Sequence, residues 1–170
     1  MAAQGAQFLR HACWDGEMLY STWHESRLGH PAFLDDYANV LGGLHSLLQC
    51  RWDDDDAAFA RQLADVVLSK FYDNDDGGFY FAPMDVEPLI YAPKPTLDET
   101  LPPGNATLAL VLNRLGLLFG EQRYLDAAAN TLRWGRAVME HFPTGHCGLL
   151  TALEDALLTP QAVILRGPDA

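Results

Sequence analysis

Nearly all-apolar helices alternate with amphipathic helices along residues 32–158 of this chain. The pattern predicts one apolar helix that opens with Phe33–Leu41 and another over Asn105–Phe119. The helices that follow them, Ala57–Phe71 and Gln122–Phe142, have apolar residues on one face and polar residues on the other. A helix that is apolar all round must be covered on all sides, whereas an amphipathic helix can face water. We therefore predict two layers, with buried helices inside and amphipathic helices outside, which is the architecture of an α/α toroid.

A further helix is predicted over Cys147–Leu158, and Met1–Arg10 has the composition of the end of an earlier helix. These helices are too few to close a ring. We expect a mainly all-α fold, an incomplete α/α toroid with a short β-hairpin. Residues 1–170 are expected to form a single domain, the C-terminal part of such a toroid, cut at both ends.

Four short segments have strand-like composition. Met18–Trp23 is the first, and Ala162–Leu165 is the last. Between them, Phe79–Phe81 and Leu89–Tyr91 are expected to pair as a short hairpin over one end of the helices. Ala162–Leu165, like the apolar residues of Met1–Arg10 at the other end of the chain, has no evident partner in the sequence.

Composition and charge narrow the classes of function. Hydrophobic residues make up 49% of the 170 residues, which excludes disorder, and no apolar run reaches the roughly 18 residues of a membrane span. The net charge of −12 makes nucleic acid an unsuitable partner, because phosphates need lysine and arginine. The N-terminus has no basic segment followed by an apolar one, so we expect a cytoplasmic protein without a signal peptide.

The cysteines and the acidic runs suggest structural roles. Cys13, Cys50 and Cys147 are odd in number and have no metal-site spacing, so we expect reduced packing residues, no metal and no cofactor. Asp53–Asp56 is expected to complement the N-terminus of a helix. Asp73–Gly78 fits a tight turn better than a weak cation site, because it lacks the pattern of a calcium loop.

Four segments resemble one known family in order and spacing. They are Gly29–Ala38 (GHPAFLDDYA), Gly77–Tyr80 (GGFY), Ala92–Pro95 (APKP) and Pro102–Asn105 (PPGN). The chain resembles, over about residues 15–167, the thioredoxin-domain-containing family that includes the spermatogenesis-associated proteins and their bacterial relatives. Those proteins have a thioredoxin-like domain followed by a six-hairpin toroid similar to N-acylglucosamine 2-epimerases.

The resemblance implies that this chain corresponds to the C-terminal toroid portion, without the thioredoxin-like domain, so no redox activity is expected. Two segments depart from the family's tendency. Thr22–Ser26 (TWHES) lacks the positive charge of the arginine-aspartate-glycine that relatives tend to carry there. Pro103 stands where relatives tend to have a serine, which removes a hydroxyl and a backbone N–H.

Asp35 and Asp36 open the first buried helix and are candidate catalytic groups. At the mouth of a toroid, a carboxylate serves as acid, base or acceptor for a sugar hydroxyl. The alternative is helix capping and dipole pairing. Glycoside hydrolysis uses two carboxylates about 5–10 Å apart, and Asp98 or Glu99, before the second buried helix, is a candidate second group.

Epimerases of the similar fold move a proton next to a carbonyl, typically with histidine, whose pKa suits that task. His24, His30 and His146 are predicted in loops at the same end, and of these we select His24 and His146. The remaining histidines are expected in helices, as packing or surface groups: His11, His45 and His141.

Five further residues are predicted to contact a substrate. Trp23 offers an aromatic face, Lys94 lies on a stiff proline-flanked segment, and Asn105 is either a helix N-cap or a ligand for sugar hydroxyls. Tyr37 and Asp98 complete the set.

Three functions agree with these observations. The first is sugar binding, or sugar isomerisation or epimerisation, at the mouth of the toroid. The second is a non-catalytic scaffold or protein-interaction module, and the third is an inactive fragment. Because half a toroid exposes apolar helix faces, a homodimer or association with a missing N-terminal portion is expected.

Overall fold

The computed structural model describes residues 1–84, 92–158 and 163, and within them the fold is mainly α-helical. A two-stranded antiparallel hairpin, β1 (Trp23–His24) with β2 (Arg27–Leu28), and a short 3-10 helix at Pro143–Gly145 accompany the helices. The mainly-α prediction is confirmed. The α-helices are α1 (Ala2–Ala12), α2 (Leu34–Cys50), α3 (Asp54–Lys70), α4 (Gly104–Phe119), α5 (Gln122–Trp134), α6 (Arg136–His141) and α7 (Cys147–Leu157).

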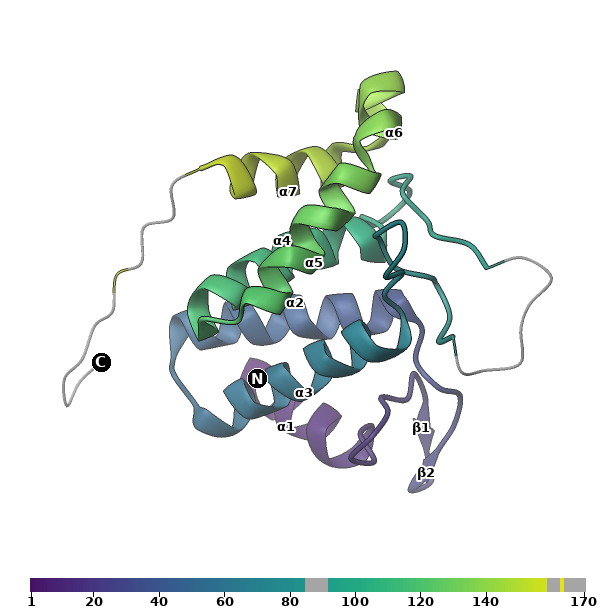
Figure 1. The fold of residues 1–170 in the computed structure, drawn as a ribbon. Coiled ribbons are helices and arrows are strands. Elements are labelled where there is room, and N and C mark those ends of the chain that lie inside the picture. Colours follow the sequence, from purple (N-terminus) through teal and green to yellow (C-terminus); the bar gives the residue numbers. More distant parts are fainter. Residues whose placement is uncertain (85–91, 159–162, 164–170) are drawn as a thin grey trace.

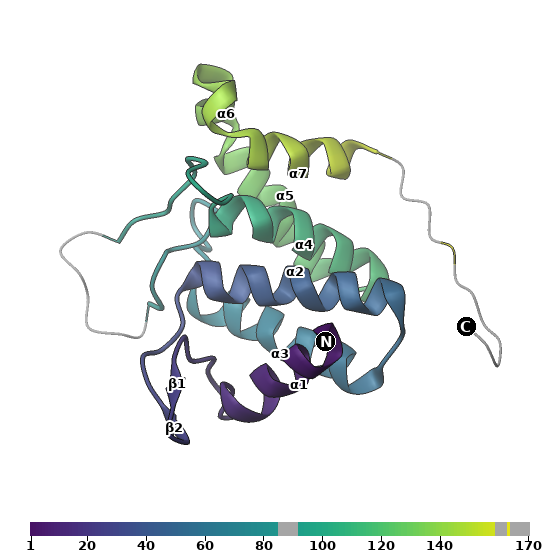
Figure 2. The ribbon, with the colours of Figure 1, turned by 180° about the vertical axis from the view of Figure 1, so that it is seen from behind.

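The helices form two layers. α4 lies between α2 and α7, and these three helices start at the same end of the molecule, next to the long connections (Figures 1 and 2). α3 and α5 run back in the opposite direction and cover one face of this row (Figure 1). We call α2, α4 and α7 the inner row and α3 and α5 the outer row. The described helices form an open stack rather than a closed ring.

Neighbouring helices bury less of the inner row than its apolar sequence predicts. Seven of the 17 residues of α2 are buried, the same share as in α3. The prediction that α2 is covered on all sides is therefore wrong. Asn39, Gly43 and Ser46 form an exposed stripe along α2 at helical spacing. The stripe is exposed because the open stack leaves one side of the inner row without a neighbouring helix, as Figure 2 shows.

α3 begins three residues earlier than its apolar pattern predicts. The Asp53 carboxylate accepts a hydrogen bond of 3.1 Å from the backbone N–H of Asp56 and so caps the helix. The Arg51 guanidinium forms ion pairs with the carboxylates of Asp53 and Asp56, each at 2.8 Å. The expectation that this acidic run marks a helix N-terminus is confirmed, because carboxylates there satisfy free N–H groups and oppose the helix dipole.

The last amphipathic helix is broken, which corrects the prediction of one helix over Gln122–Phe142. α5 ends at Trp134 and α6 begins at Arg136. At Gly135, between them, a Cβ atom would lie 3.1 Å from the side chain of Leu149. The chain turns where α7 crosses it closely, and a contact made so far along the sequence leaves no periodic signal.

Two apolar clusters fill the space between the layers. The larger joins α2, α3, α4 and α5 around buried rings, and burying each large side chain contributes about 1.5–3 kcal/mol. The smaller lies beneath α7 and consists of Ala106, Ala109, Leu132, Met139, Leu149 and Ala152. Arg114 adds an ion pair of 2.7 Å to Asp155, which ties α7 to α4. α7 is therefore held by a small core at the edge of the stack.

The N-terminal predictions are met in part. α1 packs three half-buried apolar residues, Ala6, Leu9 and Ala12, against the larger cluster, yet none of its residues is buried. Within Met18–Trp23, the backbone makes isolated bridges, and only Trp23 enters the hairpin. Among the described residues, no helix is both long enough and apolar enough to cross a membrane.

The predicted hairpin over the helix ends lies partly outside the described residues. Leu89–Tyr91 is not among them, and of Ala162–Leu165 only Val163 is described. Phe79 instead forms a bridge with Tyr72, which precedes it on the same loop.

The packing role expected for the cysteines is correct for one of three. Cys13 is buried, which raises the pKa of its thiol. Cys50 and Cys147 are exposed, because they lie at the last residue of α2 and the first residue of α7, where the helices leave the core.

Candidate functional site

The shared end of the inner row holds most of the predicted site residues. Asp35 and Asp36 lie in the first turn of α2, Asn105 in the first turn of α4, and His146 immediately before α7. Figure 1 shows the three helix starts on the side of the long connections between α3 and α4. The contacts of each residue decide whether its polar atoms are free for a substrate.

The two aspartates of α2 cap helices. One Asp35 carboxylate oxygen accepts a hydrogen bond of 2.7 Å from the backbone N–H of Gly104 and so joins the starts of α2 and α4. Burial raises the pKa of Asp35, although this hydrogen bond opposes the rise. A Cβ atom at Gly104 would lie only 2.6 Å from the same oxygen, so the contact requires glycine. Asp36 accepts a hydrogen bond of 2.9 Å from the N–H of Phe33 at the start of its own helix.

Tyr37 lies in the core rather than at a substrate surface. Its side chain is buried against Phe71, with the ring centroids 5.2 Å apart. Its hydroxyl oxygen accepts a hydrogen bond of 2.8 Å from the backbone N–H of Leu19. Burial raises its pKa to about 12. Tyr37 therefore anchors the N-terminal segment to α2.

Asn105 is neither the N-cap nor an exposed amide. Pro103 occupies the N-cap position, and Asn105 is fully buried. Its amide nitrogen donates to the carbonyl oxygens of Phe79 and Pro95, both at 2.9 Å, and its oxygen accepts from the N–H of Phe79 at 2.7 Å. The side chain thus holds two separate loop segments against the first turn of α4.

Lys94 folds back onto the chain instead of extending into a mouth. Its ammonium lies 2.6 Å from the carboxylate of Asp73 and donates to the carbonyl of Gly77 at 3.0 Å. It also lies 4.8 Å from the ring centroid of Trp134 and 5.3 Å from that of Tyr80, within the range of cation–π attraction. The side chain is only 14% exposed.

The Asp73–Gly78 segment is a tight turn, as predicted, and it holds a cation that the chain itself supplies. Besides the Lys94 ammonium, the Asp73 carboxylate accepts hydrogen bonds from the N–H groups of Asp75 and Asp76 and from the hydroxyl of Tyr80. Burial by itself raises the pKa of Asp73, but these hydrogen bonds and the ammonium lower it well below its usual range. The carboxylate therefore stays charged and paired.

Asp98 and His146 organise the start of α7. One Asp98 oxygen accepts a hydrogen bond of 2.8 Å from the N–H of Gly148, and the other has no hydrogen-bond partner within the described residues. His146 is buried, and its Nδ1 lies 2.8 Å from the carbonyl oxygen of Phe142 while its Nε2 lies 3.2 Å from the hydroxyl of Thr96. Since a carbonyl only accepts, Nδ1 donates a hydrogen bond to Phe142, while Nε2 forms a hydrogen bond with the Thr96 hydroxyl.

Trp23 and His24 lie apart from these groups, on the exposed hairpin. The His24 side chain is 88% exposed, and its Nε2 atom lies 3.6 Å from the carboxylate of Glu25. Trp23 packs edge-on against Phe8 of α1, with the ring centroids 5.5 Å apart. The hairpin and the start of α7 lie at opposite edges of the stack in Figure 1, so His24 and His146 do not form one site.

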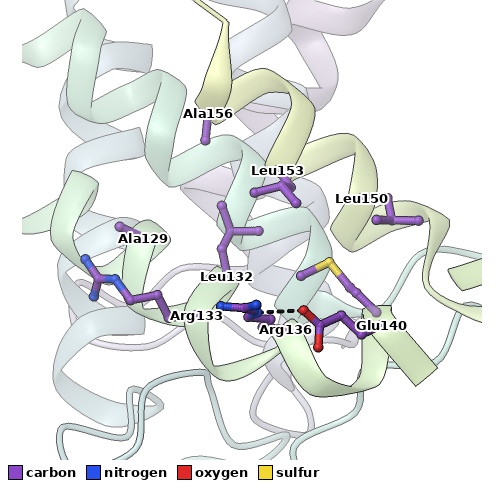
Figure 3. A pocket seen from close by; sticks show the side chains of 9 residues that line it. Ala129, Leu132, Arg133, Arg136, Glu140, Leu150, Leu153 and Ala156 are labelled. Atoms are coloured by element: carbon purple, nitrogen blue, oxygen red, sulfur yellow. Dashed lines mark hydrogen bonds and ion pairs between the residues drawn. The ribbon is translucent and has the colours of Figure 1, made fainter. Parts of the chain in front are cut away.

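A long groove between α5 and α7, with α6 at one end and part of α4 at the other, was not anticipated from the sequence. A hollow of about 490 Å³ adjoins a second of about 290 Å³, and the two share Ala129 and Ala156. Figure 3 shows Leu132 and Leu153 facing this space from opposite helices. We call the two hollows together the α5–α7 groove. The first is lined by Ala129, Leu132, Arg133, Arg136, Met139, Glu140, Leu150, Leu153 and Ala156.

The sequence did contain a signal for this groove. α7 carries Leu149 and Leu150 side by side, followed by Leu153 and Leu157, and these side chains point to more than one face of the helix. Packing against α4 therefore cannot bury all of these leucine side chains. None of the nine predicted site residues lines either hollow.

The resemblance to the thioredoxin-domain-containing family rests on its sequence motifs alone, because no family model matches the chain and no similar protein is found among the curated proteins. Family membership, and the sugar chemistry it implies, therefore stay predictions.

Replacing Asn105 with alanine should destabilise the fold strongly. The substitution leaves one buried N–H and two carbonyls of the loop segments without their partner, and the expected loss is about 2–4 kcal/mol. Urea unfolding followed by circular dichroism measures the change. Asn39→Ala, on the exposed stripe of α2, is the control and should cost less than about 1 kcal/mol. Equal effects of the two substitutions would contradict the role given to Asn105.

The Asp73–Lys94 pair should make stability depend on acid pH. Because the pKa of Asp73 is lowered in the folded state, its contribution is present above the ordinary value of 3.8 and is lost as the pH falls toward the folded-state value. Unfolding free energies measured between pH 6 and about pH 2.5 should fall less steeply in Asp73→Asn than in the wild type. Asp75→Asn, an exposed neighbour, should keep the wild-type slope.

Proposed function

We propose that this chain is a non-catalytic interaction module that binds an amphipathic helix of a partner chain in the α5–α7 groove. The observation that carries the proposal is the shape and lining of the groove. It follows one face of α5 from Gln122 to Arg133, a length of about 17 Å or three helical turns. A rod of this length with one apolar face is the complementary shape.

The repeat of helices supports the same occupant. α3 packs on α2 and α5 packs on α4, so each of these inner helices has an outer helix over it. α7 is the third inner helix, and within the described residues it has no outer helix of its own, because α5 packs mainly on α4 and less on α7. Covering apolar surface with a helix contributes about 25 cal/mol per Å² removed from water, which supplies the driving force.

The contacts of the predicted catalytic residues favour this function over catalysis. The carboxylates of Asp35 and Asp36 accept from backbone N–H groups, and both ring nitrogens of His146 have partners. One Asp98 oxygen has no partner among the described residues, but that oxygen is buried, and His24 lies apart on the exposed hairpin. A general acid or base needs a free polar atom within reach of its substrate. These groups have the contacts of structural residues.

Binding of a stapled, charge-neutral amphipathic peptide with leucines on one face should depend on Ala156. This alanine is exposed and lies where the two hollows meet, so Ala156→Glu places a charge in the middle of the groove without disturbing the core. Fluorescence anisotropy should show binding that weakens at least about ten-fold, because a charge would be buried unpaired.

Thr151→Glu is the matched control, since Thr151 is exposed on the same helix and lines neither hollow. It should leave the affinity within about two-fold of the wild type, in keeping with a change at the protein surface. Absence of binding by the wild type, or an equal loss in both variants, would overturn the proposed function.

Carbohydrate binding is the second candidate, and one surface feature favours it. Phe33 is 43% exposed and stacks on Phe81, with centroids 4.8 Å apart and an angle of 11° between the rings. The half-buried Asp35 and Asp36 follow it in the first turn of α2. A flat aromatic face beside carboxylates is suited to the apolar face and the hydroxyls of a sugar. Because the histidine contacts do not favour proton transfer, we propose binding rather than isomerisation or epimerisation.

A sugar that binds only the folded chain should raise its melting temperature. Differential scanning fluorimetry with monosaccharides, disaccharides and sugar phosphates tests this, since ligand at 100 times its dissociation constant adds about 2.7 kcal/mol of stability. The shift given by one sugar class should disappear in Phe33→Ala and persist in Leu101→Ala, an exposed apolar control. No shift with any sugar would remove this second candidate.

A further inference from the structure

The charges at the two ends of the α5–α7 groove differ in sign. Arg133 and Arg136 lie at the end next to α6, where Arg136 also pairs with Glu140 at 2.7 Å. Asp126 lies at the opposite end and accepts a hydrogen bond from Gln122 at 2.9 Å. The groove is therefore more basic where α5 ends and more acidic where α5 begins.

The packing order sets a direction for the occupant. The outer helices α3 and α5 both run opposite to the inner row (Figure 1). A helix that continues the outer row over α7 would run parallel to α5. Its N-terminus would then lie near Asp126 and its C-terminus near Arg133 and Arg136.

The helix dipole favours the same direction. The N-terminus of a helix carries a partial positive charge and the C-terminus a partial negative charge. In the parallel direction, the positive end meets Asp126 and the negative end meets the two arginines. The reverse direction would bring like charges together at both ends.

We infer that the groove selects a partner helix by direction and charge, preferring basic residues in its first turn and acidic residues in its last turn, and that it binds this helix parallel to α5. The inference rests on the proposed function. It names the chemistry of the partner, which the largely apolar lining of the first hollow by itself leaves open.

The same charges argue against a second copy of this chain as the partner. α1 is the long described helix with no buried residue, although Ala6, Leu9 and Ala12 pack on the larger cluster and Arg10 pairs with Asp55 at 3.1 Å. Its last turn carries Arg10 and His11, and its first turn has no acidic residue. In the inferred direction Arg10 would face Arg133 and Arg136. The groove is therefore suited to a different polypeptide.

Two stapled peptides of identical composition test the direction. The first has lysines in its first turn and glutamates in its last turn, and the second has these charges exchanged. The first should bind the wild-type chain about five- to ten-fold more tightly, as expected for two or three exposed charge pairs. The preference should shrink at high salt, because exposed charges are screened.

Substitution of the arginines provides the matched test. Arg133→Gln combined with Arg136→Gln should reduce the preference to within about two-fold, while Arg27→Gln, on the distant hairpin, should leave it unchanged. A photo-crosslinker at the N-terminus of the first peptide should label residues near Gln122 and Asp126 rather than residues near Arg133.

The outcomes separate the inference from the proposed function. Equal binding of both peptides, a reversed preference, or crosslinks at the arginine end would overturn the inference and leave the interaction module intact. Failure of these peptides and of the neutral peptide to bind would overturn both. Sedimentation of the wild-type chain as a dimer that Ala156→Glu dissociates would show that the partner is a second copy, against the inference.

Discussion

The three hydrogen bonds of the buried Asn105 side chain are the constraint on which the rest of this structure depends. The long connection between α3 and α4 passes the first turn of α4 twice, at Phe79 and at Pro95, and the amide of Asn105 binds the backbone at both points. A buried backbone group without a partner costs free energy comparable to a lost hydrogen bond. One side chain thus fixes how the loops meet the inner row.

Most polar groups at that end of the molecule have similar structural roles. Asp35 joins the starts of α2 and α4, Asp98 caps α7, and Lys94 neutralises the carboxylate that closes the Asp73–Gly78 turn. Helix N-termini present free N–H groups, and carboxylates satisfy them. Residue types that suit sugar chemistry are therefore also those that a stack of parallel helix starts requires for folding.

The other side of the stack has the opposite character. α7 rests on a small cluster rich in alanine and leaves leucines facing the α5–α7 groove. Polar pairing is dense where the inner helices begin, whereas apolar surface remains uncovered where α7 meets the outer row. This contrast supports the interaction surface that we propose over a catalytic centre.

The sequence by itself determined the mainly helical fold, most of the helices and their order, because apolar periodicity and capping are local properties of ten or twenty residues. It also identified the turn at Asp73–Gly78 and the acidic helix start at Asp53. Only the tertiary structure decided what the polar side chains do, since their partners are far along the chain: 69 residues separate Asp35 from Gly104, and 50 separate Asp98 from Gly148. The break at Gly135 and the groove likewise depend on where α7 packs, which no local pattern encodes.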